Sequence, residues 1–325
     1  MKKYVLLLAA ASLAAAACSK PGETSAENAD SQKVDISFDF TEPLATKASG
    51  NGETVDNAIN NVQVFIFDNA GRIQAYNSAE GSSVGLTCTT GPKKVVGIAN
   101  APDLTNVTTL ADLKSRKSLL TNNFPDAIVM DKEIPCTITS SGPQSIEVER
   151  QCAKVLLSSV AVNFSLAQYQ STPVKIKSVF LTNVVSQRHY LDESTPATWI
   201  NQMKLDSGAP AVVAETFSNV SVEHSKTWSE VHRFYCFPNP TEADTHSATW
   251  SARHTRLVVE AEVNGVVCYY PVTLPKIERN HIYSVALTIT RPGLPSPEDP
   301  SEILSPDFTI TVAPWAGTTS LEEEI

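Results

Sequence analysis

Apolar and polar residues alternate over residues 34–40, which is the clearest β pattern in the chain. The alternation places Val34, Ile36, Phe38 and Phe40 on one face of an extended segment. A strand of this kind buries its apolar face and leaves the other face polar. We therefore predict a strand over residues 34–40 whose four large side chains point into a core.

Short apolar runs bounded by turn residues predict further strands through the rest of the chain. Asn264-Gly265 separates two of these runs and is a specific signal for a two-residue hairpin turn, because both residues tolerate positive φ. The predicted strands cover residues 62–67, 73–76, 93–98, 146–157, 160–164, 174–182, 257–263, 266–272, 281–290 and 308–312.

Three segments depart from the strand pattern. Helical spacing of Leu110 and Leu113, continued by Leu120, predicts one short helix near residues 107–120. Residues 41–57, which include Lys47, contain few large apolar side chains and read as an exposed loop. The proline-rich residues 291–306 predict an extended connector that isolates the last strand from the body of the fold.

The number and spacing of these strands indicate an all-β protein built from two β-sandwiches, with the one helix in the first. A chain of 325 residues is long enough for two domains. We expect an N-terminal sandwich over residues 48–155 and a C-terminal sandwich over residues 156–325 that includes the terminal strand.

Composition excludes some functions without naming one. Hydrophobic residues make up 42% of the chain and charged residues 18%, which favours a folded protein over a disordered one. Thirty-five Asp and Glu against 25 Lys and Arg give a formal charge of −10, which repels a phosphate backbone. We therefore expect no nucleic-acid partner.

The N-terminus has the features of an export signal. Lys2 and Lys3 precede an apolar run that is too short to span a bilayer, and small residues lead directly to Cys18. This pattern favours a lipoprotein signal peptide over residues 1–17 with lipid on Cys18, although an ordinary signal with a chance cysteine has the same flanks. Residues 18–47 would then comprise a polar tether and the first strand.

No familiar catalytic motif is present in the sequence, so we expect neither an enzyme nor a cofactor. The histidines at 224, 232, 246 and 254 fall in one region, but their polar neighbours are more typical of solvated loops than of a metal site. Five cysteines follow Cys18 without any C-x-x-C pair, which favours small buried side chains over zinc or redox chemistry; they are Cys88, Cys136, Cys152, Cys236 and Cys268.

Several stretches resemble the fimbrillin family, the type V pilins. The export signal with Cys18, the strand at 34–40 and the loop with Thr46-Lys47-Ala48 resemble the start of these proteins. Further matches follow in the right order: residues 90–102 (TGPKKVVGIANAP), 148–155 (VERQCAKV), 176–184 (IKSVFLTNV), 279–283 (RNHIY) and 311–315 (TVAPW).

The resemblance implies two transthyretin-like sandwich domains, lipidation at the outer membrane, one cut by a trypsin-like protease and polymerisation by strand exchange. In this chain the cut would fall between Lys47 and Ala48, although the family's site is often an arginine. It would free the strand carrying Val34, Ile36, Phe38 and Phe40 and leave an open sheet edge that another strand can fill. The matching donor strand would carry Phe308, Ile310, Val312 and Trp315.

We therefore expect a fimbrial subunit or adhesin at the outer membrane and in surface fimbriae. Its partners would be other fimbrial subunits, the outer membrane through the lipid, and a host or bacterial surface receptor. The apolar-poor tail at 316–325 also fits an anchor, accessory or tip subunit.

Other interpretations remain open at this stage. Residues 34–40 could be a permanent edge strand and Lys47 an ordinary loop residue. Residues 308–312 could simply be the last strand of the second domain, with Trp315 as a core anchor. A surface lipoprotein that binds glycans through exposed aromatics is the alternative function, with Trp228, Trp250 and Tyr269 as the candidate platforms.

Overall fold

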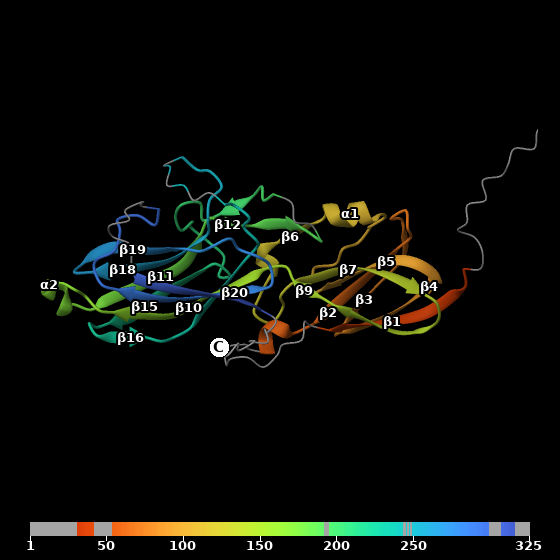
Figure 1. Cartoon of the computed structure of the whole chain (residues 1–325), viewed down its shortest axis with the longest axis horizontal. Helices are drawn as coiled ribbons and strands as arrows, with labels where there is room; N and C mark the ends of the chain where they lie inside the picture. The colour runs from red at the N-terminus through yellow and green to blue at the C-terminus, as the bar shows by residue number, and fades with distance from the viewer. Residues whose placement is uncertain are drawn as a thin grey trace, which may run out of the picture.

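Strands dominate the fold and gather in two layered halves that lie end to end along the long axis (Figure 1). A computed structural model describes residues 31–41, 54–191, 195–242, 249–298 and 307–315, together with Thr245 and Ser247. The all-β fold class is thereby confirmed. None of the helices in these ranges is long and apolar enough to cross a membrane.

The first half consists of two sheets that face one another. One sheet has the order β4-β1-β8, with β4 at Ser83–Thr89, β1 at Lys33–Thr41 and β8 at Gly142–Glu147. The other has the order β3-β2-β5-β7-β9, with β3 at Ile73–Glu80, β2 at Asn61–Phe67, β5 at Gly91–Ala99, β7 at Met130–Ile138 and β9 at Glu149–Arg150.

The second half repeats this two-layered arrangement. One sheet has the order β16-β10-β20-β21, and β17 also pairs with β10. Its strands are β16 at Lys226–Trp228, β10 at Ala153–Val162, β20 at His281–Ile289, β21 at Asp307–Pro314 and β17 at His232–Cys236. The other sheet has the order β15-β11-β18-β19, with strands at Ala214–Val222, Val174–Thr182, Arg256–Val263 and Val266–Thr273.

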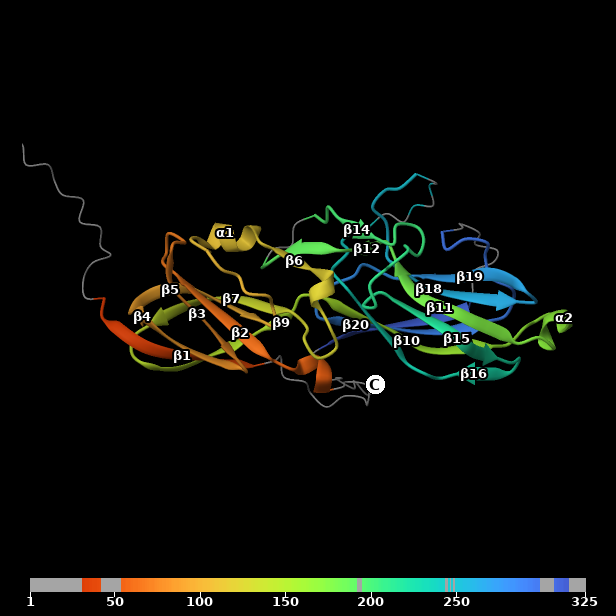
Figure 2. The ribbon, with the colours of Figure 1, turned by 180° about the vertical axis from the view of Figure 1, so that it is seen from behind.

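Short elements join the two halves. β6 at Lys117–Leu119 pairs with β13 at Gln187–His189, so a segment from each half contributes to one small ladder. A second small ladder joins β12 at Val184–Val185 to β14 at Trp199–Ile200. These ladders lie beside the point where the sheets of the first half give way to those of the second (Figure 2).

The predicted helix is present but shorter than expected. α1 covers Leu110–Ser115, and the Thr109 hydroxyl caps it by accepting the Asp112 amide at 3.0 Å. It ends early because the following residues pair as β6. A second helix, α2 at Ala167–Gln170, was not predicted, nor were the 3-10 turns η1 at Thr54–Asn57 and η2 at Leu120–Asn122.

Most predicted strands are confirmed, and the hairpin at Asn264-Gly265 has positive φ at both residues. The continuous strand expected over residues 146–157 is wrong, because the chain there passes from β8 through β9 to β10. β4 and β7 were missed, since Gly85 interrupts the apolar pattern of one and three charged residues and Pro135 interrupt that of the other.

The prediction that the proline-rich segment isolates the last strand is also wrong. β21 pairs antiparallel with β20 along its whole length and forms the edge of that sheet. Part of the connector is docked as well, because Leu294 bridges to Tyr269. Further along it, the Glu298 carboxylate is buried beside the guanidinium groups of Arg253 at 3.2 Å and Arg256 at 2.5 Å.

The five cysteines in the described ranges are all free thiols. Four are buried, as predicted for small apolar side chains, and Cys136 is half-buried. Burial raises the pKa of the Cys152 thiol to about 12, so it is protonated at neutral pH. Of the four histidines considered as metal ligands, His246 lies outside the described residues, and within the described ranges no three His, Cys, Asp or Glu side chains are grouped as a metal site.

Candidate functional site

β1 is the central strand of its sheet. It pairs antiparallel with β4 and parallel with β8, so Phe38 lies opposite Val84 on one side and Gln144 on the other. Ile36, Phe38 and Phe40 are buried in the core, as the alternation predicted, and Val34 is half-buried. A strand with two paired edges and a buried face is therefore an integral part of the first sandwich and not a loose edge.

The polar face of β1 is bound to β4 as well. The Thr87 hydroxyl donates to Asp35 at 2.6 Å and the Ser83 hydroxyl donates to Asp39 at 2.7 Å. Both bonds are exposed to solvent, so they set the register of β1 more than they add stability.

Phe40 shows how closely β1 fits the opposite sheet. Its ring packs on the backbone of Gly97 in β5, where an added Cβ atom would lie only 2.8 Å from the Phe40 ring. The same position would be 3.0 Å from the Ile146 side chain of β8. Glycine at this position therefore makes room for the large side chain that β1 inserts, which the sequence alone did not show.

β1 is joined to the rest of the fold through residues 42–53, which lie outside the described residues, as do Cys18, Lys47 and Ala48. The next described element is η1. Its Asp56 carboxylate is buried and binds the Lys154 ammonium at 2.5 Å and the Tyr235 hydroxyl at 2.7 Å. The chain is thus fixed on both sides of the predicted cut, by β1 before it and by Asp56 after it.

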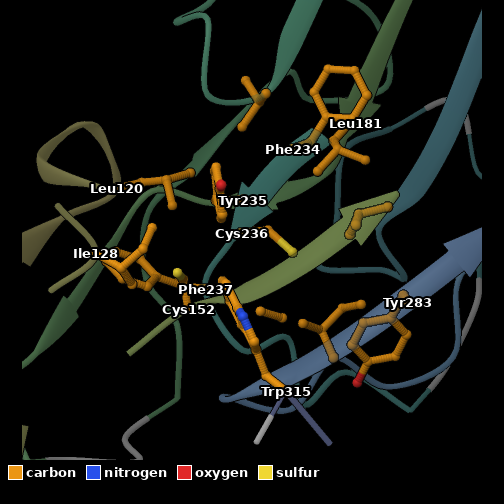
Figure 3. Close-up of a cluster of buried hydrophobic side chains, with 14 of the residues drawn as sticks. Leu120, Ile128, Cys152, Leu181, Phe234, Tyr235, Cys236, Phe237, Tyr283 and Trp315 are labelled. Atoms are coloured by element: carbon orange, nitrogen blue, oxygen red, sulfur yellow. The ribbon is translucent and has the colours of Figure 1, made fainter. Parts of the chain in front are cut away.

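Trp315 ends the predicted donor strand and lies against the same residues. Its ring stacks on Tyr235 with the centroids 5.9 Å apart, and the cationic groups of Arg150 and Lys154 each lie 4.8 Å from its centroid. Its backbone amide donates to the Asn280 carbonyl at 2.7 Å. Figure 3 shows Trp315 at the edge of the buried cluster.

Ile310 and Val312, two of the candidate donor residues before Trp315, are less buried than Trp315. Ile310 is half-buried against the core and Val312 is 46% exposed, while Phe308 belongs to β21 by its backbone pairing. β21 is held by one neighbouring strand, by Ile310 against the core and by Trp315, whereas β1 is held by two strands and three buried side chains. In this chain the structure therefore places the candidate donor as the last strand of the second sandwich, with Trp315 as its anchor.

Sequence reasoning missed the residues around Trp315, although they were present in the family-like motifs. Arg150 and Lys154 belong to the stretch at 148–155, and Asn280 belongs to the stretch at 279–283. A lysine between apolar residues in a predicted strand was the available signal, because a buried charge needs a partner.

A buried carboxylate ties the two halves together beside this cluster. Asp131 of β7 accepts the Arg279 guanidinium at 2.7 Å, the Gln151 amide at 2.5 Å and the Leu191 backbone amide at 3.0 Å. Burial opposes the charge, but Arg279, Arg188 and these hydrogen bonds outweigh it and hold the pKa of the Asp131 carboxyl below its usual range.

This shift predicts acid sensitivity. Because the folded pKa of Asp131 is depressed, its contribution is present above the unfolded value of about 3.9 and is lost as pH falls through the folded pKa. We expect Asp131→Asn to lower the free energy of unfolding by about 1.5–3 kcal/mol at pH 7, with a smaller difference from wild type below about pH 4. Urea denaturation at both pH values measures this, and an unchanged difference would contradict it.

The aromatic side chains proposed as glycan platforms lie on different elements. Trp228 in β16 packs against Phe217 at 5.2 Å between centroids and against His232 at 4.4 Å. Trp250 packs against Trp199 at 5.7 Å. Tyr269 is half-buried in β19, in the opposite sheet to Trp228. Both indole rings are thus engaged with neighbouring side chains, and Trp228 and Tyr269 lie in different sheets.

Comparison with known proteins agrees with this architecture. Residues 35–140 match the family model of the major fimbrial subunit protein FimA. A fimbrilin (FimA) from Porphyromonas gingivalis is 16% identical with a TM-score of 0.62, over 88% of this chain and 98% of that one.

Two further solved structures share the fold. A protein proposed to act in cell adhesion, from Bacteroides eggerthii, is 18% identical with a TM-score of 0.69, over 89% of this chain and 98% of that one. The tip fimbrial protein Mfa3 from Porphyromonas gingivalis, with a C-terminal truncation, is 13% identical with a TM-score of 0.53, over 86% and 100%. The resemblance to the fimbrillins is therefore confirmed: residues 35–140 match the FimA family model, and the chain has the fold of a fimbrilin.

Proposed function

We propose that this chain is a fimbrial subunit or adhesin, a structural protein without catalysis that assembles with other fimbrial subunits. It is exported as a lipoprotein with lipid on Cys18, reaches the outer membrane, and is cut between Lys47 and Ala48. The two halves, expected at 48–155 and 156–325, act as separate domains, with β1 completing the first and β10, which begins at Ala153, opening the second. The family match and the shared fold support the fimbrial role.

One observation carries the assembly mechanism. The strand that fills the centre of a three-stranded sheet is also the first strand of the described chain, and one segment, residues 42–53, joins it to everything that follows. A single cut in that segment makes β1 removable without breaking any other covalent bond. Its departure leaves β4 and β8 with unpaired backbone groups on either side of an apolar groove.

The energetics favour refilling that groove. Full burial of a large apolar side chain stabilises a fold by about 1.5–3 kcal/mol, and β1 buries Ile36, Phe38 and Phe40. A whole domain is stable by only about 5–15 kcal/mol. An empty groove would therefore leave the first sandwich marginal, and a strand with the same alternation would bind it strongly.

β21 of another subunit is the candidate replacement. Ile310 and Val312 alternate with threonines, as the apolar residues of β1 alternate with polar ones, and Phe308 continues the series. β21 is a sheet edge, so leaving its own subunit disrupts its pairing with β20 on one side, the Ile310 contact with the core and the Trp315 contacts. Exchange of this kind adds a strand through main-chain bonds and uses side-chain pockets for specificity.

Limited trypsin treatment of the purified precursor tests this proposal. We expect one early cut after Lys47, seen as a new N-terminus at Ala48 by mass spectrometry, followed by ladders of stable multimers on a gel. Lys47→Ala should prevent both the cut and the ladders. Lys20→Ala is the matched control, because a cut at Lys20 lies before β1 and leaves that strand in place. Ladders from uncut protein, or cut protein that stays monomeric, would contradict the proposal.

A further inference from the structure

A hollow of about 430 Å³ opens at the junction of the two halves, away from the groove of β1. The β6–β13 ladder forms one wall, and loops of the second half form the others. Sixteen residues line it: Lys117, Val185, Gln187, Arg188, His189, Thr195, Pro196, Ala197, Thr198, Pro238, Pro240, Lys276, Ile277, Glu278, Arg279 and His281. The volume falls within the usual range for small-molecule sites, about 300–1,000 Å³.

The charge of this hollow is opposite to that of the whole chain. Four of its sixteen lining residues are lysine or arginine, two more are histidine, and only Glu278 is acidic. The chain as a whole carries a formal charge of −10. A concave site with cationic walls concentrates anions by focusing the electrostatic field, so the hollow favours a negatively charged ligand.

One cation is held rigidly in place. The Arg279 Nη2 atom binds Asp131 at 2.7 Å and the Glu149 carbonyl at 2.7 Å, while Nε binds the Arg150 carbonyl at 3.0 Å. Among the described residues no hydrogen bond is made by Nη1 of Arg279. A fixed guanidinium with one unused amino group is a preorganised donor for a carboxylate.

Two further cations at the rim are available. Lys117 and Lys276 are exposed, and neither forms a salt bridge with any residue in the described part of the chain. They come from different segments of the chain, one from β6 and one from the loop before β20. Lys117 and Lys276 can therefore bind an anion in the hollow without breaking an existing salt bridge.

The other lining residues determine which uncharged part of a ligand fits the hollow. Val185, Ile277 and three prolines offer apolar surface, and Gln187, Thr195 and Thr198 offer hydrogen-bonding groups. None of the sixteen lining residues is Phe, Tyr or Trp, so the lining has no large aromatic face, and its only aromatic rings are the imidazoles of His189 and His281. An inorganic anion would leave most of the volume unfilled, since one water occupies about 30 Å³. A compact, hydroxyl-rich ring with a carboxylate suits these walls.

We propose that this hollow binds an acidic monosaccharide, either free or at the end of a glycan. The carboxylate lies among Arg279, Lys117 and Lys276, and the hydroxyl groups bond to the threonines and Gln187. The site is independent of the groove of β1, so it serves as a recognition site whether or not the subunit polymerises.

Isothermal titration calorimetry of the full chain tests the site with three probes: sialyllactose, which ends in a carboxylated sugar, neutral lactose, and free N-acetylneuraminic acid. We expect saturable binding of sialyllactose that weakens with added salt, and binding of lactose weaker by about tenfold or more. Free acid that binds while sialyllactose does not would still support the site and identify a soluble ligand.

Variants localise the binding. Lys117→Glu with Lys276→Glu should weaken sialyllactose binding by about tenfold or more, because each reverses an attractive charge. Lys204→Glu is the matched control, since Lys204 is exposed but does not line the hollow. Thermal denaturation shows that each variant is folded. The proposal is overturned if no carboxylated sugar binds, if sulfate binds as tightly as the sugar, or if the double variant binds like wild type.

Discussion

Replacing Asp56 by alanine is expected to lower the free energy of unfolding by about 3–5 kcal/mol, because it leaves the buried Lys154 ammonium without its carboxylate partner. The Lys154 ammonium is almost completely buried, and its carboxylate partner is Asp56 at 2.5 Å. The same change leaves the buried Tyr235 hydroxyl without its acceptor. Asp56 lies just beyond the predicted cut, so its loss would also loosen the chain that follows β1.

Urea denaturation of the single and double variants measures this effect. Asp56→Ala combined with Lys154→Met should recover much of the loss, because removing both charges removes the uncompensated one. Glu262→Ala is a matched control for a surface carboxylate that pairs with Lys175 and Lys177, and should cost far less, because solvent screens exposed ion pairs. If Asp56→Ala and Glu262→Ala lower the free energy of unfolding equally, the buried Asp56–Lys154 pair contributes no more to stability than an exposed pair.

Replacing Trp315 by alanine is expected to destabilise the fold by about 3–5 kcal/mol and to release β21 first. Trp315 is 7% exposed and is the most buried of residues 307 and 309–315, whose burial is described. Its removal leaves β21, at the edge of a sheet, with its pairing to β20 and the half-buried Ile310 as its described contacts. An edge strand that has lost its anchor opens locally at a lower cost than the whole fold.

Hydrogen exchange distinguishes local release from general weakening. In Trp315→Ala the amides of β21 should exchange far faster than those of β11, which lies inside the opposite sheet. Trp315→Phe should retain most of the protection, because a smaller ring still packs on Tyr235 and faces the two cations. Under the proposed function, trypsin-cut Trp315→Ala should form ladders faster than wild type. Equal protection of β21 in wild type and Trp315→Ala would argue against an anchoring role.

Local patterns of apolar, polar and turn residues were sufficient to predict many of the strands. The alternation at 34–40 and the apolar runs at 174–182 and 281–290 correspond to β1, β11 and β20. These strands were predictable because the order of apolar and polar residues along a strand reflects which of its faces are buried. Asn264-Gly265 predicted its hairpin because turn geometry depends on adjacent residues. The removal of β1, the cut at Lys47 and lipidation of Cys18 stay predictions.

Contacts across the sequence could not be read in the same way. Asp56 and Lys154 lie 98 positions apart, and Asp131 and Arg279 lie 148 apart, so no local window contains either pair. The sequence showed charged residues within strand-like segments but gave no means of pairing them. For the same reason the cationic hollow could not be predicted from the sequence, since its walls come from segments that only the folded chain brings together.

The mixed pairing of β1 fixes the polarity of any fibre built by replacing it. β1 runs parallel to β8 and antiparallel to β4, so a substitute strand that keeps this geometry enters in only one direction. Acceptor and donor lie in different halves of the molecule, so each contact between copies is heterologous, and contacts that close neither a ring nor a reciprocal swap extend the assembly. Growth would then give an open filament with two unlike ends, one presenting an unfilled acceptor and the other an unused donor.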